Sequence, residues 1–480
     1  MKMGKSLGLA LAGCGLLAVA PVARADEDAS LQDRIRDLEK TVLELKEQAA
    51  RQQSAEPLSV QVERYLQEQE KGSTWTDKNG KALGKAVDSA WVSMYLRIRP
   101  TWSKNNFDFT DGIDDEGTTT LTRDKLGVGA RLHDGLAAYL ELNMAGTWGN
   151  ASSAYANDGG FVITPSLQQA YIDGLWNKQL GAKTRVGRFE MAYGDEYVIG
   201  DRDFSPTGLA FDGARISKNW ESNSFSADFL FAKLVDGFKN GTTPTPDDQI
   251  YLLGVYGNYY GMEGKTGLPG GFEPFYLCVK DQADPVGPLA VWTHDVHTFG
   301  VHWYGDKATK DKGGLGWNVN LSGQYFKEMT WGTDSRLMYT MSSSKWTPKV
   351  FAQWAYAGGD HGNAGGAKYN PLFMDGHGRF GYSDLIGFSN LNLYGLGLHV
   401  TPVDGLTYGV EVRSDNVARN FAGGSSSKGI GTEYDFVVKH HYSENVDIEA
   451  AYAWVNFRHN GNTGGADDTQ LAYVNLVLSF

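Results

Sequence analysis

Cysteine is almost missing from this 480-residue chain, which contains only Cys14 and Cys278. Two cysteines cannot supply a disulfide framework, a zinc ribbon or a c-type haem attachment motif. Basic residues are fewer than acidic ones, with 44 Lys and Arg against 57 Asp and Glu. This net negative charge argues against nucleic-acid binding. After the N-terminal segment no apolar run approaches the ~18 residues of a transmembrane helix, which excludes a helical membrane protein.

The motifs of common catalytic sites are missing as well. The chain has no Gly-x-Ser-x-Gly, no His-Glu-x-x-His, no phosphate-binding loop and no dinucleotide fingerprint. We therefore predict that the protein is not an enzyme and has no cofactor and no bound metal. Glycine and aromatic residues are abundant instead, with 60 Gly, 13 Trp, 24 Tyr and 22 Phe, a composition that suggests many strands and turns.

The first 25 residues have the pattern of a secretory signal peptide. Lys2 and Lys5 precede an apolar stretch, and Ala23-Arg24-Ala25 supplies a small-x-small cleavage site. The alternative is a lipoprotein signal, because the residues before Cys14 resemble a lipobox. Either reading exports the chain from the cytoplasm.

Residues 26–56 are predicted to form a coiled-coil helix, followed by a polar linker at 57–88. The apolar residues Leu31, Ile35, Leu38, Val42, Leu45 and Ala49 are spaced as the a and d positions of a heptad repeat. Such a short helix needs a partner for its seam, which favours self-association through residues 31–52, as a homotrimer or a dimer in the periplasm. The alternative is a single helix packed against the rest of the chain.

From residue 89 to residue 480 the sequence alternates with period two. The apolar phase carries aliphatic and aromatic side chains, whereas the polar phase carries Arg and Lys, as in Val92-Ser93-Met94-Tyr95 and its continuation. This is the pattern of a membrane barrel with lipid outside and water inside. Eighteen such segments can be counted between residues 91 and 480, which predicts an all-β, 18-stranded antiparallel transmembrane β-barrel.

Connection lengths support the barrel. Gaps after odd-numbered segments are mostly long and gaps after even-numbered ones are mostly short, as at the extracellular and periplasmic ends of outer-membrane barrels. The gap at 328–334 is unexpectedly short and that at 261–271 unexpectedly long, so one register is uncertain. The longest gap, 358–391, could fold over or into the pore and is the best candidate for a gate. The last segment ends on Phe480, which resembles an outer-membrane assembly signal.

Several stretches resemble the alginate export porin family. The first signature comprises Val186–Asp195, Asp201–Gly208 and Phe211–Arg215; Tyr369–Phe373, Gly381–Ile386 and Gly431–Asp435 look like further ones. The resemblance covers about residues 90–480 and implies an 18-stranded monomeric barrel that passes an anionic polyuronate through an arginine-lined lumen. It also implies that Arg188, Glu190, Asp195 and Asp212, which match the motif, form either a constriction or a salt-bridge network. The predicted coiled coil departs from that porin.

The polar phase of the strands identifies the residues expected to line the pore. They are Arg97, Arg99, Arg123, Lys125, Arg131, Arg185, Arg215, Arg413, Glu141 and Asp173. A wall with an excess of basic residues would concentrate anions. Alternatively, these arginines pair with lumenal acids and hold the interior together.

These observations predict an outer-membrane channel of alginate-export type for passive passage of an anionic or polar solute, with a polysaccharide among the candidates. Two alternatives are a trimeric phosphate- or dicarboxylate-selective porin with a coiled-coil stalk and a structural barrel that tethers the envelope. Expected partners are outer-membrane lipid, lipopolysaccharide and the solute, with no nucleic acid. The N-terminal stalk is expected in the periplasm.

Overall fold

The computed structural model describes the barrel and the segments inside it. The described residues are 87–106, 109, 116–132, 135–148, 162–177, 181–221, 224–236, 249–260, 270–281, 295–308, 313–326, 328–341, 346–359, 368–419, 428–458 and 466–480. The predicted signal peptide, coiled coil and nearly all of the linker lie outside them. Within this described part of the chain, no helix is both long and apolar enough to cross a membrane.

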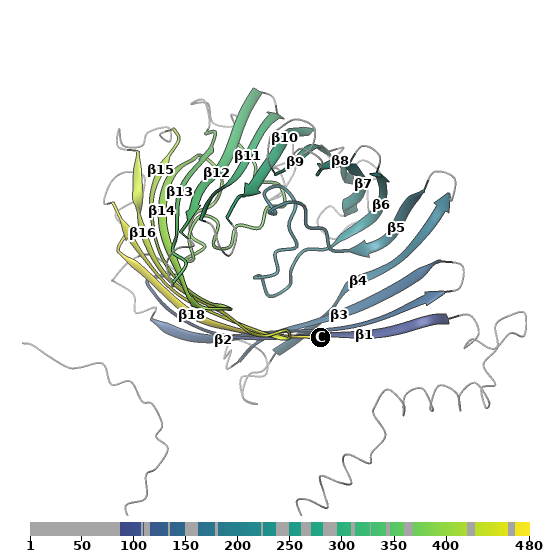
Figure 1. The fold of residues 1–480 in the computed structure, drawn as a ribbon, viewed down its shortest axis with the longest axis horizontal. Helices are drawn as coiled ribbons and strands as arrows, with labels where there is room; N and C mark the ends of the chain where they lie inside the picture. Colours follow the sequence, from purple (N-terminus) through teal and green to yellow (C-terminus); the bar gives the residue numbers. More distant parts are fainter. Residues whose placement is uncertain are drawn as a thin grey trace, which may run out of the picture. The chain divides into compact units, whose positions relative to one another are not determined.

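Eighteen strands form one antiparallel sheet that closes on itself (Figure 1). Each strand pairs with its neighbours in sequence, and β1 pairs with both β2 and β18, which closes the barrel. The strands are β1 (Val87–Lys104), β2 (Gly117–Leu132), β3 (Ala137–Trp148), β4 (Val162–Asn177), β5 (Ala182–Phe189), β6 (Phe211–Trp220), β7 (Phe225–Asp236), β8 (Gln249–Tyr259), β9 (Gly271–Asp281), β10 (Val296–Asp306), β11 (Gly314–Phe326), β12 (Glu328–Thr340), β13 (Lys349–Ala357), β14 (Leu391–Val403), β15 (Leu406–Val417), β16 (Gly429–Ser443), β17 (Val446–Phe457) and β18 (Thr469–Ser479). The predicted 18-stranded barrel is therefore confirmed.

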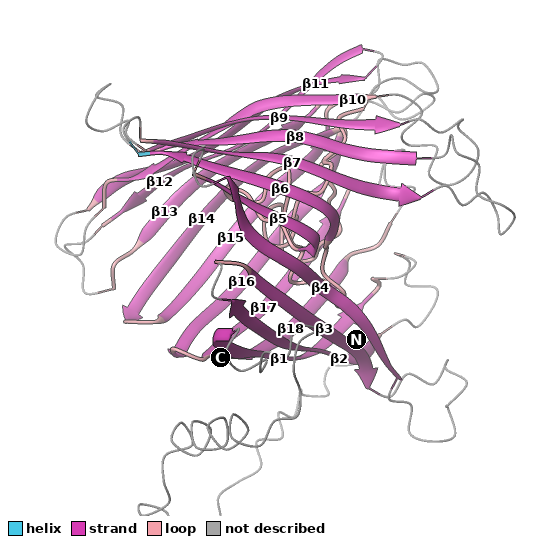
Figure 2. Ribbon diagram, turned by 90° about the vertical axis from the view of Figure 1, so that its right-hand side faces the viewer, coloured by secondary structure: helices cyan, strands magenta, loops and turns pink. Residues whose placement is uncertain are grey.

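The barrel reverses the usual distribution of polarity. Large apolar side chains such as Val92, Ile172 and Leu396 are exposed, whereas Arg97, Arg123 and Arg413 are buried. The strands run at a tilt around the barrel (Figure 2). Alternation along them places the first set toward lipid and the second toward the interior. A closed sheet also leaves no unpaired strand edge within the membrane.

The predicted start of the twelfth strand was wrong. The segment expected at residues 335–342 is β12, which begins at Glu328, so a single residue separates it from β11. The physical reason is that the alternation extends further back: Met329 and Trp331 are exposed, whereas Thr330 is buried. The gap expected at 328–334 is therefore part of the strand and pairs with β11.

Two segments leave the wall and enter the barrel (Figure 1). The first lumenal segment, residues 190–210, connects β5 to β6, and the second lumenal segment, residues 368–390, is the described part of the connection from β13 to β14. Their apolar side chains form an internal core that includes Ile199 and Phe388. The second lumenal segment belongs to the predicted gate at 358–391, and it lies inside the pore.

Candidate functional site

The two lumenal segments are paired with each other. Ile199 forms an isolated parallel β-bridge with Phe373. The amide of Gly200 donates to the Phe373 carbonyl at 3.0 Å, and the Phe373 amide donates to the Val198 carbonyl at 3.1 Å. These hydrogen bonds satisfy backbone groups that would otherwise be buried without partners. The interior of the barrel therefore contains one composite obstruction built from two parts of the chain.

Four basic side chains of the wall hold the first lumenal segment. This basic cluster consists of Arg97 and Arg99 on β1 and of Arg123 and Lys125 on β2. Arg99 donates to the carbonyl of Phe204 at 2.7 Å, and Arg97 donates to the carbonyls of Asp203 and Ser205. Backbone carbonyls accept hydrogen bonds without cancelling a full charge, so these contacts position the segment and leave the guanidinium charges in place.

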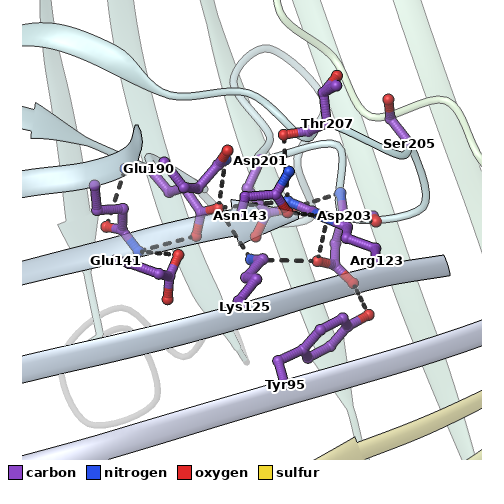
Figure 3. Close-up of polar contacts among 12 residues, drawn as sticks. Tyr95, Arg123, Lys125, Glu141, Asn143, Glu190, Asp201, Asp203, Ser205 and Thr207 are labelled. Carbon is purple, nitrogen blue, oxygen red and sulfur yellow. Dashed lines mark hydrogen bonds and ion pairs between the residues drawn. The ribbon is translucent and has the colours of Figure 1, made fainter. Parts of the chain in front are cut away.

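Asp203 and Glu190 supply the carboxylates that face the basic cluster (Figure 3). Arg123 Nη1 donates to Asp203 Oδ1 at 2.8 Å, and Lys125 Nζ donates to Glu190 Oε1 at 3.0 Å. Burial acts to raise the pKa of Asp203, but the charges of Arg123 and Lys125 outweigh it, so the net direction is downward. Asp203 is thus an ionised anchor for the segment. Lys125 also borders a cavity of about 480 Å³ near Phe480.

The second lumenal segment is held by a separate set of ionic contacts. Arg379 donates to Asp195 Oδ2 at 3.1 Å and to Asp334 Oδ2 on β12 at 2.7 Å. Burial acts to raise the pKa of Asp195, but the Arg379 charge outweighs it and brings the pKa to about 2. On β16, Glu433 accepts a hydrogen bond from the backbone amide of Ser383 at 2.9 Å. The first lumenal segment is therefore held by basic residues of the wall, whereas acidic residues of the wall hold Arg379 and Ser383 of the second.

A cavity of about 330 Å³ lies beside these contacts, between the second lumenal segment and the strands β11, β12 and β16. Arg336 lines it and donates to the carbonyl of Arg379 at 2.7 Å. Among the described residues, Arg336 makes no ion pair within 4.0 Å. It therefore presents a positive charge whose nearest hydrogen-bond partner is a neutral carbonyl.

Three carboxylates, those of Glu196, Asp201 and Asp375, lie within 4.8 Å of one another where the lumenal segments meet. Burial, followed by repulsion from Asp201 and Asp375, raises the pKa of Glu196 to about 7. Repulsion of this kind is expected when carboxylates crowd together. Acidic groups alone do not define a metal site, and we assign no metal to them.

The remaining residues predicted to line the pore are distributed along the wall. Arg185 forms two hydrogen bonds with Asp173, at 2.7 and 2.8 Å, and Arg215 lies 3.7 Å from Asp228. Glu141 accepts hydrogen bonds from Tyr139 and Gln169. Arg413 forms ion pairs with Glu411 and Asp435. Arg131 is exposed near the end of β2 and forms no ion pair with a described residue. These contacts correspond to the pairing interpretation more closely than to a row of free arginines.

The four residues taken from the family motif do not lie together. Glu190 and Asp195 are in the first lumenal segment, where they bind Lys125 and Arg379. Arg188 and Asp212 form an exposed 2.7 Å pair across β5 and β6, in the same phase as Val186 and Ile216, whose side chains face outward. The structure therefore places this pair on the outer surface, away from the constriction.

Sequence reasoning missed three side chains that build the obstruction: Asp203, Asp334 and Arg379. Asp203 was part of the quoted motif, but nothing in the local sequence says that it binds a strand about 80 residues earlier. Asp334 was hidden in the gap wrongly expected at 328–334. Arg379 lies in the predicted gate, and its buried pairing could only be seen once the segment was placed inside the barrel.

Fold and site together define the class of this protein. A closed antiparallel barrel with an apolar outer face and a polar interior is an outer-membrane channel through which a solute passes passively. The chain belongs to the alginate export family, because the model of that family, described as "Alginate export", matches residues 164–457. Family and fold point to a channel rather than to an enzyme.

Solved structures with a similar fold include proteins from two bacteria. Pseudomonas aeruginosa OccK9 (OpdG) is 13% identical, with 82% of this chain and 99% of that chain covered and a TM-score of 0.54. Acinetobacter baumannii OccAB3 is 11% identical, with coverages of 82% and 100% and a TM-score of 0.52. P. aeruginosa OccK2 (OpdF), solved in complex with glucuronate, is 10% identical, with coverages of 82% and 97% and a TM-score of 0.54. A search of curated proteins found no match.

Proposed function

We propose that this channel passes an anionic solute that carries uronic-acid carboxylates, past a lumen wall with excess positive charge. The observation that carries the proposal is the charge balance of the basic cluster. Three of its four cations, Arg97, Arg123 and Lys125, form ion pairs, and they share only two carboxylates, those of Asp203 and Glu190. Arg99 has no carboxylate partner among the described residues and binds a backbone carbonyl instead.

Such an excess acts on a solute through its electric field. The basic cluster is buried, so its charges are only weakly screened by water and salt. A low-dielectric channel lined by one sign of charge raises the local concentration of the opposite ion. Arg336 adds a second positive site on the other side of the lumen, beside the 330 Å³ cavity.

The proposed chemistry of the solute has two sources of support. The family is described by export of alginate, which is a polyuronate, and OccK2 was solved in complex with glucuronate, a uronic acid. A carboxylate is also the group that an arginine recognises best, because the guanidinium fork matches its two oxygens. A phosphate or a simple dicarboxylate would use the same charges, so the test has to compare them.

The test is ion selectivity and block in planar lipid bilayers. In a salt gradient the reversal potential should show anion preference, and glucuronate should reduce the current more than neutral glucose or phosphate at equal concentration. Arg99→Gln should weaken the anion preference, whereas Arg99→Lys keeps the charge and should retain most of it. Cation preference of the wild-type channel, or equal block by glucose and glucuronate, would refute the proposal.

For the N-terminal region we propose that residues 1–25 are removed as a signal peptide and that residues 26–56 form the self-associating coiled coil predicted from their heptads, joined to the barrel by the linker 57–88. The spacing from Leu31 to Ala49 supports this. Native mass measurements with and without residues 26–57 test it. A monomer in both cases would contradict self-association.

A further inference from the structure

One histidine contacts both lumenal segments and the wall. The imidazole of His377, in the second lumenal segment, is stacked on the ring of Phe204, in the first, with ring centroids 3.3 Å apart and an angle of 4° between the planes. The guanidinium carbon of Arg99 lies 3.7 Å from the centroid of the same Phe204 ring. Two groups cannot occupy one face of a ring at these distances, so Phe204 is held between His377 and the β1 arginine.

The ring nitrogens of His377 both face acceptors. Nδ1 is 2.8 Å from Asp384 Oδ2, and Nε2 is 3.0 Å from the hydroxyl oxygen of Tyr473 on β18. That hydroxyl donates its own proton to Glu449 Oε1 on β17 at 2.7 Å, so it can only accept from the imidazole. A neutral imidazole has one N–H and cannot satisfy both contacts. The doubly protonated imidazolium, which donates from both nitrogens, satisfies both contacts at once.

The charges around the ring favour the same form. Asp384 lies in the segment of His377, and Glu449 Oε1 lies 3.6 Å from Nε2. The facing cations are Arg99, across Phe204, and Lys439 on β16, which is bound to Glu449 at 2.8 Å. Other polar neighbours are Tyr473, Asp375, which accepts from the His377 amide at 3.0 Å, and Tyr382, whose ring lies edge-on to the imidazole with centroids 5.6 Å apart. Asp195, Glu196, Arg336 and Arg379 line one cavity with His377, and Arg202 lines another. Burial acts to lower the pKa of His377, but the hydrogen bonds and charges of Asp384 and Glu449 outweigh it and raise the pKa.

We propose that His377 is a positioning residue of the channel: its imidazolium fastens the two lumenal segments to each other and to the wall, and loss of its proton frees the second lumenal segment and widens the solute path. Without that proton the ring keeps one of its two hydrogen bonds and loses its charge between Asp384 and Glu449. It also loses the cation–π contribution of its stack on Phe204. The channel is then narrow below the pKa of His377 and wider above it, whatever solute it carries.

The experiment records single-channel conductance in symmetric potassium chloride from about pH 5 to about pH 9, a range that brackets the ordinary histidine pKa. Wild-type conductance should rise through one transition above about pH 6.5, with the steepness of a single proton. His377→Gln should give the high conductance at every pH. The guanidinium that His377→Arg introduces is planar and always charged, so this variant should keep the low conductance at every pH.

Two further variants make the experiment decisive. His441→Gln removes another histidine–carboxylate pair, His441 with Asp447 at 2.7 Å, which is exposed between β16 and β17, and should follow the wild-type curve. Phe204→Leu removes the stack but no titratable group and should raise conductance at low pH even if His377→Gln does not fold.

Heat-modifiable migration in gels checks that each barrel is closed. The proposal is overturned if His377→Gln keeps the wild-type pH curve, because a group other than His377 would then be the sensor. It is equally overturned if His377→Arg opens with rising pH or if Phe204→Leu stays at the low conductance. Because the readout is conductance in a simple salt, it can fail while the proposed uronate preference holds, and the reverse is also true.

Discussion

Arg123 binds Asp203 twice: one guanidinium nitrogen donates to the carbonyl oxygen of Asp203 at 2.7 Å and to its carboxylate at 2.8 Å. The two residues lie on opposite sides of the boundary between wall and lumenal segment. Their contact fixes the segment and, at the same time, cancels part of the positive charge of the basic cluster. The position of the first lumenal segment and the net charge of the basic cluster therefore depend on the same contact.

Asp203→Asn should increase anion preference. The asparagine keeps an acceptor oxygen and the backbone carbonyl is unchanged, so the segment stays in place, but one negative charge disappears beside Arg97, Arg123 and Lys125. The reversal potential in a potassium chloride gradient measures the change. Asp203→Glu, which retains the charge, serves as the control, and an unchanged potential in Asp203→Asn would show that the cluster does not set selectivity.

Arg413→Gln should destabilise the barrel strongly. Arg413 is buried and pairs with Glu411 and Asp435, so its removal leaves the buried Asp435 carboxylate without its ion-pair partner and Glu411 with only His399 beside it. Breaking a buried ion pair from one side costs about 3–5 kcal/mol. Urea-induced unfolding in detergent measures the loss. Arg188→Gln breaks the exposed pair with Asp212 and should cost only about 0–1 kcal/mol.

Gly381→Ala should displace the second lumenal segment and raise conductance. Gly381 has φ of 132°, and a Cβ there would lie 2.3 Å from the carboxylate of Glu433, which also accepts from Ser383. The strain amounts to about 1–3 kcal/mol. Gly387→Ala, in the same segment, meets no atom within 4 Å and should behave as the wild type in single-channel recordings. Equal conductance of both variants would contradict the expectation.

Glu196 predicts a pH effect on stability. Its pKa is raised from 4.5 to about 7 in the folded protein, so the native state binds this proton more tightly than the unfolded chain. The stabilisation of the native state that this tighter proton binding gives is complete below about pH 4.5 and is lost as the pH rises through about 7. Glu196→Gln should therefore leave stability unchanged near pH 4 and increase it near pH 8, by about 2 kcal/mol or less after screening. Unfolding curves at the two pH values test this, and equal effects at both would refute it.

The fold could be read from the sequence because its main signal is local. Alternation such as Val92, Met94, Leu96 and Ile98 against polar neighbours needs no knowledge of the partner strand, and the partition between lipid and water enforces it. For the placement of single side chains, the family motif was a less reliable guide than the alternation along the strand. The motif grouped Arg188 with Glu190 and Asp195 in a constriction or a salt-bridge network, whereas its phase with the exposed Val186 already placed it outward.

The sequence by itself determined the class of fold, the number of strands and the family, and its alternation placed wall residues such as Arg97, Arg123 and Arg413 in the polar phase. Only the tertiary structure decided what those side chains bind. Arg97 reaches the carbonyl of Asp203 across 106 residues, and His377 reaches Tyr473 across 96. Such partners are chosen by where two connecting segments fold inside a closed barrel, a global condition that strand periodicity does not encode. For that reason the predicted row of pore arginines became, in the structure, the anchor of the obstruction inside the pore.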